Sequence, residues 1–87
     1  MVKVRITYIG VLADIVGSHT EVVEISSDNV TVEELINFLN STKPSLKKLS
    51  GSIPLIHVFV NDEEAPLSKV LRNNDRVTLM PPLYEGG

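Results

Sequence analysis

The chain has no cysteine, few aromatic residues and no apolar run long enough to cross a bilayer. The absence of cysteine excludes disulfides and thiolate metal sites, and it fits a reducing cytosol. Basic residues are also few, since 8 lysines and arginines against 11 aspartates and glutamates leave a net charge of −3. Neither nucleic acid nor a membrane is therefore expected as a main partner, because phosphate neutralisation needs a basic face.

The length of 87 residues predicts one domain with a single small core. The apolar fraction of 43% is ordinary for a globular protein. A strand pattern starts in the first residues, Met1-Val2-Lys3-Val4, so we expect no signal peptide and a cytoplasmic location.

Strand and helix periods can be followed through the first half of the chain. Residues 2–9 alternate apolar and polar side chains, which predicts a half-buried strand. A short helix is expected over Val11–Val16, ended by Gly17, and a second strand over Glu21–Ile25 pairs antiparallel with the first.

The best-defined helix follows a capping-box pattern. Thr31 and Glu34 have the spacing at which each side chain bonds an unpaired amide of the first turn. An amphipathic stripe then predicts a helix from Val32 to Ser41, which Lys43-Pro44 ends.

The second half is read as two strands and two turns. Leu55–Val60 and Arg76–Met80 are strand-like, and Asn73-Asn74-Asp75 has typical turn residues. We interpret Asp62-Glu63-Glu64 as a solvated turn in preference to an acid–base or cation site, because no histidine or glycine-shaped loop accompanies it.

One central helix among four strands can cover one face of a mixed sheet, with the first and last strands side by side in its middle. The prediction is therefore an α+β fold of the β-grasp (ubiquitin-like) type, with a mixed sheet of 4–5 strands and one main helix across one face, over residues 1–80. The predicted core is Val4, Ile6, Val23, Ile25, Leu35, Leu39, Val58, Val60, Val77 and Leu79.

Residues 81–87 are expected to form a flexible C-terminal tail. Pro81-Pro82 cannot continue sheet pairing, and Gly86-Gly87 can thread a slot too narrow for other residues. The ending is either a frayed terminus or a reactive one, in which the carboxylate of Gly87 takes part in the chemistry.

A docking surface is expected beside this tail. If Val58 points toward the helix, His57 and Phe59 point away, and Met80 joins them at the end of the last strand. Phe59 and Met80 would then form an apolar patch with His57 at its rim. The alternatives are that a loop buries Phe59 or that the register is reversed.

The sequence resembles the small ubiquitin-like sulfur carrier of molybdopterin synthase (the MoaD family), and more distantly the thiamine-pathway sulfur carrier (ThiS). The resemblance covers nearly the whole chain and is carried by the following motifs: Val11–Gly17, Thr31–Leu35, Val60-Asn61, and Asn74–Pro82 followed by Gly86-Gly87. Two departures are Asn73-Asn74, where the family often has glycine, and the bulkier Leu83-Tyr84-Glu85.

The resemblance implies a carrier, not an enzyme, that binds no cofactor or metal itself. A MoeB-like enzyme would use ATP and Mg²⁺ to adenylate Gly87, and a sulfur donor would convert it to a thiocarboxylate. Gly86 would keep the tail slim inside a MoaE-like large subunit, where sulfur passes to the molybdopterin precursor. The residues expected to bind partners are His57, Phe59, Met80, Pro81 and Pro82.

Two alternatives remain open. The same activated Gly87 could serve a ubiquitin-like protein modifier or a carrier for tRNA thiolation. The chain could also be a non-catalytic β-grasp binding module whose terminus is incidental.

Overall fold

A computed structural model describes residues 1–43 and 56–81. Along these residues the elements follow in the order β1 (Val2–Tyr8), α1 (Val11–Val16), β2 (Thr20–Ile25), β3 (Val30–Thr31), α2 (Val32–Thr42), β4 (His57–Val60), β5 (Glu63–Glu64), β6 (Val70–Leu71) and β7 (Arg76–Met80). Among them, no helix has the length and apolarity needed to cross a membrane.

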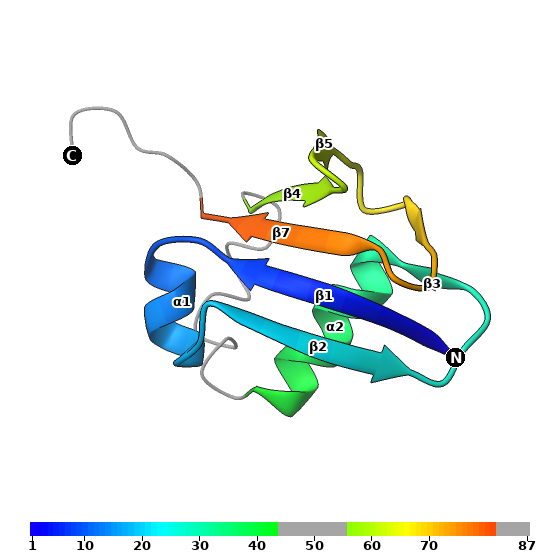
Figure 1. The fold of residues 1–87 in the computed structure, drawn as a ribbon, viewed down its shortest axis with the longest axis horizontal. Coiled ribbons are helices and arrows are strands. Elements are labelled where there is room, and N and C mark those ends of the chain that lie inside the picture. Colours follow the sequence, from blue (N-terminus) through cyan, green and yellow to red (C-terminus); the bar gives the residue numbers. More distant parts are fainter. Residues whose placement is uncertain (44–55, 82–87) are drawn as a thin grey trace.

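A five-stranded mixed sheet in the order β2-β1-β7-β4-β5 forms one layer, and α2 crosses one of its faces (Figure 1). The first and last strands are parallel neighbours at its centre, with Tyr8 opposite Leu79, and the other pairs are antiparallel. A second, two-stranded sheet joins β3 to β6. This is the predicted β-grasp architecture.

The core lies between the large sheet and α2. Every residue of the predicted core is buried except Ile25, which is half-buried and packs against the core from the end of edge strand β2. The structure adds buried residues that the predicted core omits: Val2, Tyr8, Leu12, Ala13, Val30, Val32, Ile36 and Leu71.

Helix α2 begins at the predicted capping box. The Glu34 amide donates to Thr31 Oγ1 at 3.2 Å, and the Thr31 amide donates to Glu34 Oε1 at 3.3 Å. Such a cap stabilises a helix by about 1 kcal/mol. The helix runs through Thr42, one residue further than predicted, and Pro44 lies outside the described residues.

The prediction of a turn over Asp62-Glu63-Glu64 was wrong for the two glutamates, which form β5 beside β4. The turn lies one residue earlier, because Asn61 and Asp62 adopt positive φ angles of 52° and 72°. A two-residue turn of this kind matches the twist of a hairpin and brings the next residues into pairing.

Other departures are smaller. The predicted strand over Leu55–Val60 begins at His57 in the structure, and Leu55 lies outside the described residues. The pairing of β3 with β6 was not predicted, because strands of two residues show no period. Val11, an apolar residue at the start of the first predicted helix, is exposed.

Candidate functional site: the start of the C-terminal segment

The two central strands end at the same edge of the sheet because they are parallel. The Ile9 amide donates to the Leu79 carbonyl at 3.0 Å, directly before α1. A Cβ built on Gly10 would lie 3.7 Å from Pro81 Cγ, and the φ of +59° at Gly10 favours glycine. We call Ile9, Gly10, Met80 and Pro81 the tail root. Half-buried Pro81 leaves the sheet here, whereas Pro82, Gly86 and Gly87 lie outside the described residues.

The outer face of the sheet, opposite α2, carries three of the predicted partner-binding side chains, those of His57, Phe59 and Met80. His57 pairs with Met80 across the strands, and Phe59 pairs with Thr78. Since Val58 is buried, His57 and Phe59 point away from the core, as expected. Phe59 and Met80 are half-buried, while His57 is exposed and its Nδ1 lies 3.2 Å from Glu64 Oε2.

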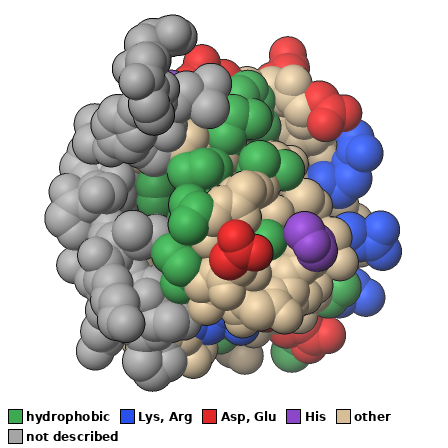
Figure 2. All heavy atoms as spheres, turned by 90° about the vertical axis from the view of Figure 1, so that its left-hand side faces the viewer, with side chains coloured by type: hydrophobic (Ala, Val, Ile, Leu, Met, Phe, Trp, Pro, Cys, Tyr) green, Lys and Arg blue, Asp and Glu red, His purple; other side chains and the backbone are tan. Residues whose placement is uncertain are grey.

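Two exposed apolar residues at the same end were missed. Ile9 is 37% exposed and Val11 is 50% exposed, and both flank Gly10 at the tail root. Figure 2 shows hydrophobic side chains gathered in a band on this end of the molecule. The sequence signal was Ile9 itself, an apolar residue on the polar side of an alternating strand.

The position of the tail root depends on the register of β7, which a polar cluster holds at the opposite end of the strand. Asn61 Nδ2 donates to Asp75 Oδ1, and the Arg76 amide donates to Asn61 Oδ1, both at 3.0 Å. The Arg72 amide donates to Asp75 Oδ2 at 2.8 Å. Two motifs behind the resemblance, Val60-Asn61 and Asn74–Pro82, therefore meet in space.

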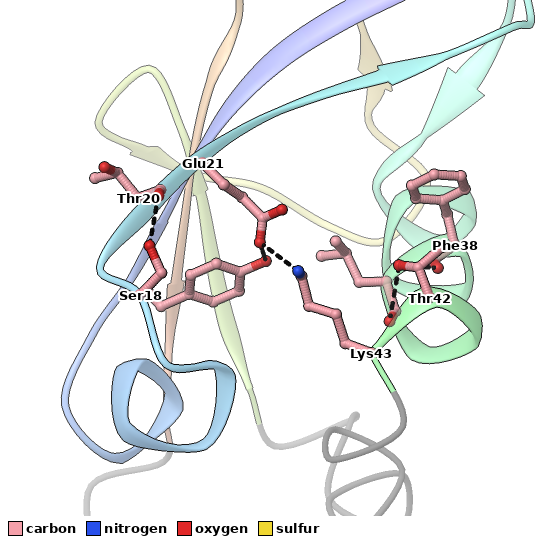
Figure 3. A network of polar contacts seen from close by, with 8 residues as sticks. Ser18, Thr20, Glu21, Phe38, Thr42 and Lys43 are labelled. Carbon is pink, nitrogen blue, oxygen red and sulfur yellow. Dashed lines mark hydrogen bonds and ion pairs between the residues drawn. The ribbon is translucent and has the colours of Figure 1, made fainter.

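A second polar cluster links the tail-root end of β1 to the last turn of α2. Tyr8 is buried, and its hydroxyl donates to Glu21 Oε2 at 2.8 Å. Lys43 Nζ lies 2.9 Å from the same oxygen, and Figure 3 shows its side chain reaching from the end of α2 toward Glu21 on β2. Burial, followed by the bond to Glu21, raises the pKa of Tyr8 well above its ordinary value of 10.0.

This raised pKa predicts a loss of stability at high pH. A tyrosine that ionises less readily when folded contributes stability below pH ~10, and that contribution falls by about 1.4 kcal/mol per pH unit as the pH rises further. Tyr8→Phe should abolish this fall, so the unfolding free energies of the two proteins should converge between pH 10 and 11. Urea unfolding at pH 7, 10 and 11 measures the two free energies of unfolding. If the difference between the native protein and Tyr8→Phe were the same at all three pH values, the prediction would be contradicted.

The described residues around the tail root offer contacts and geometry. Within residues 1–43 and 56–81, no three histidine, aspartate or glutamate side chains could hold a metal ion together. The carboxylates of Glu63 and Glu64 are exposed, and Glu64 is already engaged with His57. The side chains of the tail root can contact a partner, and its backbone fixes the direction in which the chain leaves the sheet.

Solved structures share this fold along nearly their whole length. SAMP1 from Haloferax volcanii is 27% identical, with 98% of this chain and 99% of that chain covered and a TM-score of 0.83. A putative molybdopterin converting factor subunit 1 from Pyrococcus furiosus is 20% identical, with 95% and 100% covered and a TM-score of 0.82. A third similar chain, 20% identical, comes from the complex of subunits 1 and 2 of the Helicobacter pylori molybdopterin-converting factor. The match covers 97% of this chain and 99% of that chain, with a TM-score of 0.66.

A search of curated proteins found no match. The model of the ThiS family, in contrast, matches residues 6–86, from the first strand into the glycines of the C-terminal segment. This match confirms the resemblance seen in the sequence motifs. The chain belongs to the ThiS family of ubiquitin-like sulfur carriers.

Proposed function

We propose that the protein carries sulfur as a thiocarboxylate on Gly87 and donates it in molybdopterin biosynthesis, as the small subunit of the synthase. The observation that carries this proposal is the family match through residue 86, combined with the tail root, where Gly10 and Pro81 lie close together. We further propose that residues 1–80 act as a folded body and residues 81–87 as a flexible arm.

The chemistry suits a chain without a catalytic site of its own. A carboxylate is a poor electrophile. In a MoeB-like partner that uses ATP and Mg²⁺, the carboxylate of Gly87 attacks the α-phosphate of ATP, pyrophosphate leaves, and an acyl-adenylate forms. Sulfide then attacks the acyl carbon, the bond to AMP breaks, AMP leaves, and a thiocarboxylate remains. Each step takes place in a partner's site, so the carrier needs reach and a slim end.

The reach follows from chain geometry. The six residues that follow Pro81, fully extended, span at most roughly 20–22 Å. An arm of this length places the acyl group inside a partner while the body docks at the partner's entrance. We assign the docking to Phe59, Met80, His57, Pro81 and Pro82, as expected from the sequence, and add Ile9 and Val11 because they are exposed beside the same root.

A MoaE-like large subunit is the proposed partner that receives the arm. The support is indirect: the Helicobacter pylori protein of similar fold is found in a complex with subunit 2 of its converting factor. That likeness shows the fold alone, so the assignment depends on the sequence motifs as well.

A second function, as a ubiquitin-like protein modifier, is favoured by one observation. SAMP1 from Haloferax volcanii, a small archaeal modifier protein, shares 27% identity with this chain. In that role the activated Gly87 would acylate a lysine of another protein. The two roles share activation and differ only in the acceptor, as does a carrier for tRNA thiolation.

Intact-mass analysis tests the proposal. The protein is incubated with a MoeB-like activating enzyme, ATP, Mg²⁺ and a sulfide donor. The expected result is the mass gain of one oxygen-to-sulfur exchange, followed by molybdopterin formation when the large subunit and precursor are added. Isopeptide-linked adducts would favour the modifier instead. No mass change, with an activator that is active on its own carrier, would contradict both roles and favour the plain binding module.

A further inference from the structure

The outer face of the sheet holds a second surface, at the end away from the tail root. A shallow hollow of about 330 Å³ there is lined by Lys3, Val4, Arg5, Val22, Asn74 and Arg76. We call it the basic hollow. It lies where the parallel strands β1 and β7 begin, with Arg5 beside Arg76, on the face of the sheet that is turned toward the viewer in Figure 1.

The cations of the basic hollow are only partly neutralised. Arg76 lies 3.1 Å from Asp62, and both side chains are well exposed. Lys3 and Arg5 are exposed, and within residues 1–43 and 56–81 neither side chain forms an ion pair. Glu24 lies opposite Lys3 in the register of β1 and β2 without forming an ion pair with it. Positive charge is therefore concentrated at the basic hollow, although the chain as a whole has a net charge of −3.

One wall of the hollow is apolar. Val22 is 55% exposed although it lies within a strand, beside Arg5 in the register of β1 and β2. An acidic polypeptide fits such a surface, because the valine can contact its aliphatic stems while the neighbouring cations contact its carboxylates. The surface suits nucleic acid less, because no aromatic residue lines the hollow for base stacking.

We propose that the basic hollow is a docking surface for an acidic polypeptide segment of a partner protein. Its complementarity is electrostatic: carboxylates of the segment approach Lys3 and Arg5 while its aliphatic parts cover Val22. From Arg76 to Met80 the strand spans roughly 13 Å, so the basic hollow and the tail root are separate surfaces. The proposal does not depend on any chemistry at Gly87.

Titration of the full-length, ¹⁵N-labelled protein with a terminally blocked peptide of alternating glutamate and alanine tests the proposal. At low ionic strength, amide shifts should concentrate at residues 3–5, 22, 74 and 76, and binding should weaken as salt is added. Arg5→Glu should weaken binding roughly tenfold. Lys69→Glu changes the charge equally outside the hollow and should leave the affinity within about twofold of the native value.

The amide spectra of each variant show whether it is folded, and Lys3→Gln with Arg5→Gln replaces Arg5→Glu if the reversed charge disrupts the sheet. Shifts spread over all exposed cations, or equal losses in Arg5→Glu and Lys69→Glu, would overturn the proposal. Tighter binding of single-stranded oligothymidylate than of the peptide, lost in Arg5→Glu, would overturn it in favour of a nucleic-acid surface. Each readout is independent of sulfur transfer.

Discussion

Removal of Gly87 is expected to abolish thiocarboxylate formation while leaving the fold intact. The acyl carbon would then belong to residue 86, about 3.3–3.6 Å from its proper place in the activating site. A misplacement of about 1 Å already costs ~10²-fold in rate. Adding one alanine after Gly87 displaces the acyl carbon in the opposite sense and should be as damaging. Intact-mass analysis after activation measures both variants.

The matched control is Glu85→Gln, which changes a neighbouring side chain without changing the length of the arm. It should gain sulfur within about threefold of the native rate, because the loss of a single charge costs much less than a misplaced acyl carbon. The urea unfolding curves of all variants should coincide, since the buried residues of the described part of the chain lie between Val2 and Leu79. A shortened or extended chain that still gained sulfur at the native rate would refute the assignment of Gly87.

Leu35→Ala is expected to have the largest effect on stability. Leu35 lies on the buried face of α2, fully excluded from solvent, and its truncation should cost about 2–5 kcal/mol in the free energy of unfolding. Small domains are stable by only about 5–15 kcal/mol, so a large part of the stability would be lost. Equilibrium urea unfolding measures this as a lower midpoint with an unchanged slope.

Asn37→Ala is the matched control for this variant. Asn37 is exposed on the same helix, and alanine is the better helix former, so the unfolding free energy should stay within about 0.5 kcal/mol or rise slightly. Equal destabilisation by the two substitutions would mean that α2 does not pack against the sheet as described.

The sequence predicted those parts of the fold that have a long and clear period. The alternation in β1 and β7, the stripe on α2 and the capping box at Thr31 were all confirmed, and together they determine a β-grasp arrangement. The short pairs β3–β6 and β4–β5 could not be predicted, because two residues show no period and depend on turns such as Asn61–Asp62.

The candidate site was predicted only in part, for physical reasons. Strand alternation correctly directed His57 and Phe59 outward, but the degree of burial depends on neighbours across the sheet, and Phe59 is only half-exposed. Ile9 and Val11 were missed because their surroundings depend on how the end of β1 meets Pro81. Gly86 and Gly87 lie outside the described residues, so their roles stay predictions.

The parallel pairing of β1 with β7 also has a consequence for how the protein folds during its synthesis. Arg5 lies beside Arg76, so the middle of the sheet joins segments separated by most of the chain. During translation, β1, β2 and α2 emerge without the strand that completes their core, and their apolar faces stay uncovered until residues 76–80 leave the ribosome. Folding must therefore await nearly the whole domain, and nascent chains stalled before β7 are the ones that chaperones and proteases would recognise.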